Sequence, residues 1–134
     1  MKGIGFKELA FVGYSVTDFA KAKTFYGEIL GLKETVCLGS GDDIGWMEYD
    51  LAGQTLALAK AFDHWKPGPG GGQACLEVHD LDYAVSYLKE RQVRIVQDIQ
   101  DYPHCRLALI SDPDGNTLTL HQKKSNHPDS ASEQ

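Results

Sequence analysis

The chain has 134 residues, of which 42% are hydrophobic, and this is enough material for one domain with a substantial core. Asp and Glu outnumber Lys and Arg by 19 to 13, so the formal net charge is −6, and no basic cluster provides the positive surface that nucleic-acid binding requires. No apolar run reaches the length of a membrane span, and the first residues lack the apolar core of a signal peptide.

Cysteine usage indicates the redox environment of the chain. Cys37, Cys75 and Cys105 are odd in number, are widely spaced and include no CxxC pair. This pattern is typical of a reduced protein rather than of a disulfide framework. We therefore expect a cytoplasmic protein whose partners include neither a nucleic acid nor a membrane.

The first half of the chain predicts one strand, one helix and three further strands. Residues 8–16 have the two-residue period of a strand, and Asp18 is placed to cap an amphipathic helix that ends at Gly31. The segment 61–72 is rich in Pro and Gly and predicts a linker, in which Trp65 either closes over a ligand or docks against a partner subunit. The three further strands are predicted near residues 32–38, 44–50 and 54–60.

The second half repeats this pattern at a constant offset of 62 residues. Residues 16–25 (VTDFAKAKTF) match a segment that starts at residue 78 (VHDLDYAVSY), and residues 50–58 (DLAGQTLAL) match one that starts at residue 112 (DPDGNTLTL). Two separate matches at one offset indicate two copies of a β-α-β-β-β unit. In the second copy Asp80 is the expected helix cap, and strands are expected near residues 92–98, 104–111 and 116–122.

These features resemble those of the vicinal oxygen chelate superfamily, which includes glyoxalase I, bleomycin-resistance proteins, fosfomycin-resistance enzymes and extradiol dioxygenases. The resemblance rests on the tandem units, on residues 16–32 (VTDFAKAKTFYGEILGL) and on the closing DPDGNTLTL segment. It implies an α+β fold in which the two units form an open, cup-shaped mixed β barrel. It also implies a small-molecule ligand in the barrel cavity and a homodimer.

The resulting domain prediction is a single glyoxalase-like domain over residues 1–122. It consists of two repeats, 7–60 and 73–122, joined by the linker 61–72. Residues 123–134 contain almost no apolar side chains and are expected to be a disordered tail.

The resemblance also locates the four positions at which metal-using members carry His, Gln or Glu ligands. Here these positions are Phe11, Ala57, Gln73 and Thr119. Phe and Ala have no donor atom and a Thr hydroxyl is a poor ligand, whereas a stable site takes three or four ligands. We therefore expect neither the usual metal nor another cofactor.

Strand alternation predicts which side chains face the cavity. A three-residue hairpin loop closed by Gly115 pairs Leu109 with Thr119 and Leu107 with His121. The residues expected to line the cavity are Phe11, Met47, Tyr49, Gln73, Cys75, Cys105, Leu107, Leu109, Thr119 and His121.

The register of the two hairpins remains open at this stage. In the first copy the same register places Met47 and Tyr49 on the cavity face, beside the alanine and threonine of the following strand. A slip of one residue would instead turn Arg106, Trp46 and Glu48 inward.

His121 is the candidate for a catalytic role, because a neutral imidazole near physiological pH can orient a ligand or act as an acid or base. The alternative is a solvent-bridged histidine at a strand end. Cys75 and Cys105 could support nucleophilic catalysis or hold a soft metal with His121, although buried cysteines more often serve as packing.

Three functions are compatible with these features. The first is a metal-free protein that binds a small, partly apolar molecule in its cavity. The second is a lyase, isomerase or dioxygenase-type enzyme that uses His121, either without metal or with an atypical site that includes Gln73 and a cysteine. The third is a non-catalytic assembly module. The sequence leaves open whether the protein is an enzyme.

Overall fold

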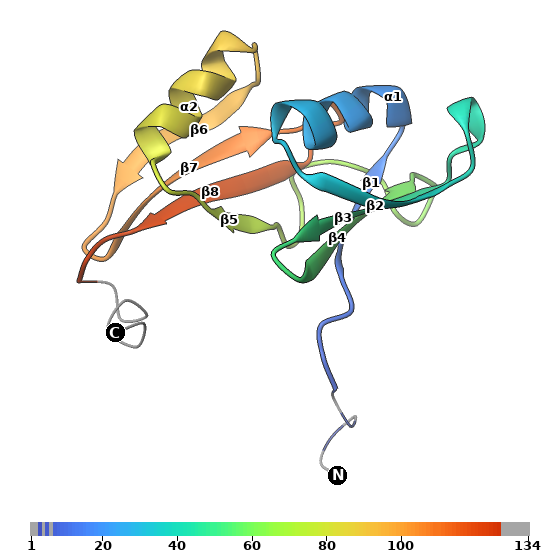
Figure 1. The fold of residues 1–134 in the computed structure, drawn as a ribbon, viewed down its shortest axis with the longest axis horizontal. Helices are drawn as coiled ribbons and strands as arrows, with labels where there is room; N and C mark the ends of the chain where they lie inside the picture. Colours follow the sequence, from blue (N-terminus) through green and yellow to red (C-terminus); the bar gives the residue numbers. More distant parts are fainter. Residues whose placement is uncertain (1–2, 4, 6, 127–134) are drawn as a thin grey trace. The chain divides into compact units, whose positions relative to one another are not determined.

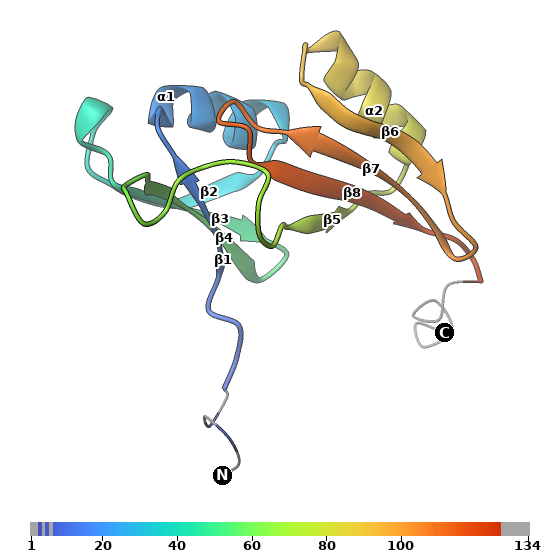
Figure 2. The ribbon, with the colours of Figure 1, turned by 180° about the vertical axis from the view of Figure 1, so that it is seen from behind.

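The computed structural model describes residue 3, residue 5 and residues 7–126. Between Lys66 and Pro67 the chain divides into two compact units, called unit 1 and unit 2 below (Figure 1). Each unit contains one β-α-β-β-β series, and the division falls inside the segment predicted as a linker. The segment between the units is best followed from behind, in Figure 2.

Unit 1 consists of a four-stranded mixed sheet with one helical segment. The strand order is β1-β4-β3-β2, in which β1 and β4 are parallel and the other pairs are antiparallel. The elements are β1 (Val12–Val16), α1 (Phe19–Ala22), the π-helix η1 (Lys23–Ile29), β2 (Lys33–Leu38), the 3₁₀ turn η2 (Gly41–Asp43), β3 (Trp46–Leu51) and β4 (Gln54–Lys60).

The helical segment of unit 1 begins and ends as the sequence predicts. An Oδ atom of Asp18 accepts a hydrogen bond from the Lys21 N–H at 3.1 Å, and Gly31 takes a positive φ of 74° just after the last turn. The segment widens from α1 into a π-helix, so the Leu30 N–H bonds the Phe25 carbonyl five residues earlier at 2.9 Å. A change of helix type of this kind has no signal in the apolar spacing of the sequence.

Unit 2 repeats the architecture, with the strand order β5-β8-β7-β6 and a parallel β5–β8 pair. Asp80 caps the helix through a bond from the Tyr83 N–H at 3.0 Å. The buried face of the helix is formed by Leu81, Val85 and Leu88. The elements are β5 (Cys75–Glu77), α2 (Leu81–Glu90), β6 (Ile95–Asp101), β7 (Cys105–Ser111) and β8 (Thr117–Lys123).

The chain does not become irregular at residue 123, where the disordered tail was expected to begin. Lys123 is the last residue of β8, and the Lys124 N–H bonds the His104 carbonyl at 2.9 Å. Residues 127–134, the rest of that predicted tail, lie outside the described residues.

The hairpin between β7 and β8 has the register predicted from its turn. Leu109 lies opposite Thr119 and Leu107 opposite His121. Asp112 closes the loop because its Oδ1 accepts bonds from two backbone N–H groups of the turn, at 2.9 and 2.8 Å. Arg106 therefore points to the α2 side of the sheet, as expected from this register.

In the hairpin between β3 and β4, the strand register differs by one residue from the predicted one, so the prediction for Met47 and Tyr49 is wrong. Met47 lies opposite Leu58 rather than Ala57, and Tyr49 lies opposite Leu56 rather than Thr55. The slipped alternative therefore holds in unit 1.

The cause of the slip is a tighter turn. Ala52 and Gly53 form a two-residue loop in which both φ angles are positive, 53° and 93°. In unit 2 the residue equivalent to Leu51 is Pro113, which cannot donate a strand hydrogen bond, and a longer loop results. The two loops align without a gap in the sequence but pair their strands differently.

This register places the core of unit 1 between its helix and one face of its sheet. Met47 and Tyr49 are 0% and 1% exposed, and the Tyr49 ring lies 6.1 Å from the ring of Tyr26 on the π-helix. Among the described residues, no helix has the length and apolar content that crossing a membrane requires.

Candidate functional site

Each sheet has one face covered by the helix of its own unit and one face turned away from it, called the helix-free face below (Figure 1). Since Met47 and Tyr49 point toward the helix, the alternating residues Trp46 and Glu48 of β3 belong to the helix-free face of unit 1. The expectation that Met47 and Tyr49 line a cavity on that face is therefore incorrect.

The helix-free face of unit 1 carries three large aromatic side chains, Phe11, Trp46 and Trp65, called the aromatic cluster below. The rings of Phe11 and Trp46 meet edge to face, with centroids 5.2 Å apart and planes at 87°. Phe11 is 41% exposed, so its ring is accessible to solvent. On the same face, Ala57 and Ala59 of β4 lie beside Glu48 and Trp46 and supply only methyl groups.

Trp65 is held in this cluster by a local turn and by a glycine. Its backbone N–H and C=O both bond Phe62, at 2.9 and 3.2 Å. A Cβ atom built on Gly13 of β1 would lie 3.1 Å from Cη2 of Trp65 and 3.3 Å from Cε1 of Phe11. Gly13 therefore allows both rings to approach the strand.

Glu48 is the charged group beside the aromatic cluster. Its Oε2 accepts a hydrogen bond from the Trp46 indole N–H at 2.7 Å, which fixes the orientation of the indole ring. In the register predicted from the sequence Trp46 and Glu48 do not face the cavity, and only the slipped alternative turns them inward. Gly53 suits the second position of a two-residue turn, whereas Ala52 is not among the residues favoured at the first, so the sequence carries only half of the usual signal for this turn.

The helix-free face of unit 2 is more polar. The register of β5, β8 and β7 brings together the predicted residues Cys75, Cys105, Leu107, Leu109, Thr119 and His121 on this face. Gln73 joins them, because the Thr119 hydroxyl donates a hydrogen bond to its Oε1 at 3.0 Å. That these residues contact a ligand remains a prediction.

Glu77 and His121 form a close pair on this face. His121 Nδ1 lies 2.5 Å from Oε1 of Glu77, and the Lys123 N–H donates to Oε2 of the same carboxylate at 2.7 Å. Burial alone would raise the pKa of Glu77, but the hydrogen bonds from His121 and Lys123 outweigh it and lower the pKa below its ordinary value. The sequence alternation places Glu77 on this face, whereas its contact with His121 depends on the parallel β5–β8 pairing.

Cys75 does not have the properties of a nucleophile. Burial, and then the nearby charges of Glu77 and Cys105, raise the pKa of the Cys75 thiol, so the reactive thiolate is scarce near neutral pH. All three cysteines are free thiols. Within residues 7–126, no group of three His, Cys, Asp or Glu side chains is arranged to hold a metal ion.

The four positions that the resemblance assigns to metal ligands do not form a donor set. Phe11 and Ala57 have no donor atom, and the Phe11 ring packs against Trp46. Gln73 and Thr119 are hydrogen-bonded to each other. The metal used by other members of the superfamily therefore does not fit these residues.

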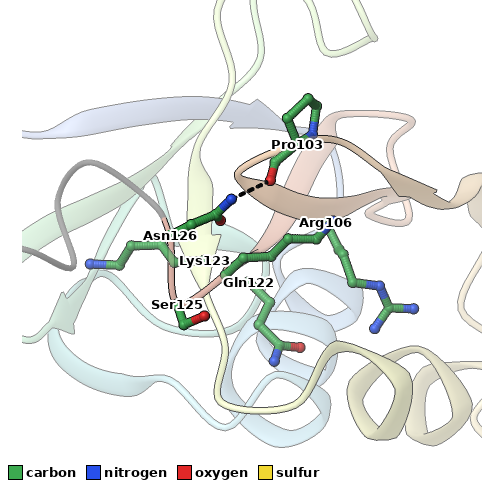
Figure 3. A pocket seen from close by; sticks show the side chains of 7 residues that line it. Pro103, Arg106, Gln122, Lys123, Ser125 and Asn126 are labelled. Carbon is green, nitrogen blue, oxygen red and sulfur yellow. Dashed lines mark hydrogen bonds between the residues drawn. The ribbon is translucent and has the colours of Figure 1, made fainter.

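A pocket of about 550 Å3 lies at the end of the β7–β8 hairpin (Figure 3). Two of its cationic groups have anionic partners: Arg106 makes two hydrogen bonds to Asp82, at 2.8 and 3.1 Å, and Lys124 Nζ lies 2.7 Å from Asp101. An anionic ligand would compete with these carboxylates, and we assign no function to this pocket. It is lined by Pro103, Arg106, Gln122, Lys123, Lys124, Ser125 and Asn126.

The fold agrees with the comparisons to known proteins. Residues 8–120 match the family model of the Glyoxalase/Bleomycin resistance protein/Dioxygenase superfamily, and the chain belongs to this superfamily. This confirms the family that the sequence resembles and the predicted α+β class with tandem β-α-β-β-β units.

Three similar proteins cover nearly the whole chain. The uncharacterized protein YaeR of Escherichia coli (strain K12) is 28% identical over 130 residues, which cover 90% of this chain and 99% of YaeR. TnmS3, an antibiotic binding protein from Streptomyces sp. CB03234, is 28% identical with a TM-score of 0.75, over 91% of this chain and 100% of that chain. A superfamily member from Sphaerobacter thermophilus DSM 20745 is 27% identical with a TM-score of 0.74, over 87% and 98%.

Proposed function

We propose that this protein binds a small, partly apolar organic molecule on the helix-free face of unit 1, without the divalent metal of other superfamily members. The observation that carries the proposal is the aromatic cluster of unit 1. There an exposed Phe11 ring is fixed edge to face against Trp46, above a strand of small side chains. The likeness to TnmS3, described as an antibiotic binding protein, supports a binding role.

The cluster suits a planar ligand for physical reasons. Aromatic rings held by packing lose little conformational freedom when they bind, and they favour stacked or edge-to-face contact with another ring. Trp46 is oriented by its bond to Glu48, and Trp65 by its turn and by Gly13. The two tryptophans are therefore preorganised before a ligand arrives.

The metal-free part of the proposal follows from the donor set. Of the four positions, only Gln73 and Thr119 have a side-chain oxygen atom. The Thr119 hydroxyl donates a hydrogen bond to Oε1 of Gln73. A divalent ion at these positions would therefore find at most two side-chain donors, fewer than the three or four ligands that a stable site takes.

Intrinsic fluorescence tests the proposal directly, because both tryptophans of the chain belong to the cluster. A panel of planar aromatic compounds is titrated into the full chain, and at least one is expected to change the emission in a saturable way. Phe11→Ala should weaken the binding of that compound about fivefold, since an aromatic contact is worth about 1 kcal/mol. Tyr83→Ala is the matched control, because Tyr83 is 67% exposed on α2.

The proposal predicts that the Tyr83 variant binds like the unmodified chain. It is contradicted if no compound gives a saturable change. It is equally contradicted if the Phe11 and Tyr83 variants bind alike.

A further inference from the structure

The Glu77–His121 pair on unit 2 determines which imidazole nitrogen carries the proton. An ionised carboxylate only accepts hydrogen bonds, so the 2.5 Å contact requires a hydrogen on Nδ1 of His121. In the neutral imidazole the basic lone pair then lies on Nε2. The Lys123 N–H holds the second carboxylate oxygen at 2.7 Å and keeps Glu77 in this position.

The surroundings of His121 are amphipathic. Leu107 lies directly opposite it on β7, and Leu109 is opposite the neighbouring Thr119. The His121 side chain is 19% exposed, so a small molecule can reach the ring. The other titratable or charged side chains from the strands beside it are Cys75 on β5, Cys105 on β7 and Lys123 on β8.

We infer that His121 is the proton acceptor of a Glu77–His121 couple that binds organic molecules carrying a weakly acidic hydroxyl group, of the phenol or enol type. The ligand O–H bond breaks, its proton moves to Nε2, and the electron pair stays on the ligand oxygen. The imidazolium that forms lies beside the Glu77 carboxylate, which stabilises its charge. Glu77 acts as a positioning residue and does not touch the ligand.

This inference is independent of the aromatic cluster, because it concerns other residues and a different unit. The lowered pKa of Glu77 supports it, since the carboxylate then remains ionised and can only accept. The leucines provide apolar contact for the carbon skeleton of the ligand, and the imidazole selects for the hydroxyl group. A ligand without that hydroxyl is expected to gain only the apolar contact.

The probe that tests this inference is 4-nitrophenol, whose ionised form has its own visible absorption band. At a pH below the probe's own ionisation, the full chain should increase this band in a saturable way. The methyl ether 4-nitroanisole has no proton to give and should show no such change. His121→Gln should abolish the increase, and Glu77→Gln should reduce it about tenfold.

Two control variants distinguish the contribution of His121 from that of other charged or titratable residues of unit 2. His104→Gln removes a histidine whose Nδ1 faces a backbone carbonyl of Asn126 at 3.1 Å, and it should keep the full response. Lys89→Gln removes a cation on α2 that pairs with Asp98, away from this face, and should also keep the response. Circular dichroism and thermal melting establish that each variant is folded before it is titrated.

Nitrogen-15 NMR of the histidine rings provides a test in the unmodified chain. The neutral His121 ring should carry its proton on Nδ1, and this preference should weaken in Glu77→Gln. The inference is overturned if the proton is on Nε2, if the nitrophenolate band does not rise, or if the rise survives in a folded His121→Gln variant. If that variant does not fold, the NMR tautomer and the comparison of 4-nitrophenol with 4-nitroanisole decide.

Discussion

At the residue scale, Tyr49 shows how much a single register shift changes. The sequence placed it on a cavity face, whereas its ring is 1% exposed in the core. Its hydroxyl has no hydrogen-bond partner among the described residues. Burial, and then the charges of Glu34 and Cys37, raise the pKa of Tyr49 to about 12.

Removing this hydroxyl should not lower the stability of the folded protein. We expect Tyr49→Phe to leave the free energy of unfolding at pH 7 unchanged or to raise it by about 1 kcal/mol, because a buried unpaired hydroxyl is lost. Urea unfolding measures this change. A loss of about 2 kcal/mol or more would show that the hydroxyl has a strong partner in the folded state.

Tyr49→Phe should also change how the stability of the protein depends on pH above neutrality. In the unfolded chain Tyr49 ionises near its ordinary pKa of 10, whereas in the folded chain it does so near 12. Between these values the folded state holds more protons, so stability falls as the pH rises. The unmodified chain should therefore lose more stability between pH 9 and pH 11 than Tyr49→Phe, and equal losses would contradict the assignment.

Glu77 gives the opposite pH dependence. Its pKa in the folded chain is below the ordinary value of 4.5, so its contribution to stability is present above that value and is lost as the pH falls. Glu77→Gln should flatten the acid limb of a plot of unfolding free energy against pH. Parallel acid limbs for the two proteins would show that the His121 and Lys123 contacts do not stabilise the charged form.

Single residues differ in how well the sequence predicts them. Asp18 and Asp80 act as helix caps because a cap needs only its own following turn. The contact between Glu77 and His121 joins residues 44 positions apart. It depends on the pairing of two distant strands, which no local pattern contains.

At the element scale, the two hairpins show that the repeat predicts the positions of the strands but not their register. The repeat places a strand, turn and strand at equivalent positions, and the structure has β3–β4 and β7–β8 there. The register differs because the turn residues differ. The longer turn around Pro113 has the predicted register, whereas the shorter turn at Ala52 shifts the pairing of β3 and β4 by one residue.

Ala52 offers a test of that shorter turn. Its φ of 53° is unfavourable for a side chain with a Cβ atom, so Ala52→Gly should raise the unfolding free energy by about 0.5–1 kcal/mol. The matched control is Ala20→Gly on the exposed side of α1, which should lower it by about 1 kcal/mol. Destabilisation by both substitutions would contradict the left-handed turn.

Gly13 tests the placement of Trp65 over β1. In a Trp46→Phe background Trp65 is the remaining tryptophan, and Gly13→Val should shift its emission because the indole has to move. Gly45→Val is the control, since no atom lies within 4 Å of a Cβ built there. If the two valine variants have the same emission spectrum, Trp65 does not pack on Gly13.

At the scale of the whole molecule, the sequence predicts the fold better than the site. The tandem units and the superfamily follow from motifs that specify turns, caps and apolar strand faces. One fold can host many functions, because function depends on the few side chains that face a ligand. The homodimer and the cytoplasmic location remain predictions from the resemblance and from composition.

The binding titration performed with and without metal tests the central claim most directly. The aromatic compound identified by tryptophan fluorescence is titrated into the full chain with a strong chelator, and again with Mn²⁺, Zn²⁺, Ni²⁺ or Fe²⁺ in place of the chelator. We expect the same dissociation constant in all of these titrations. Binding that disappears in the chelator and returns with one of the metals would contradict the account.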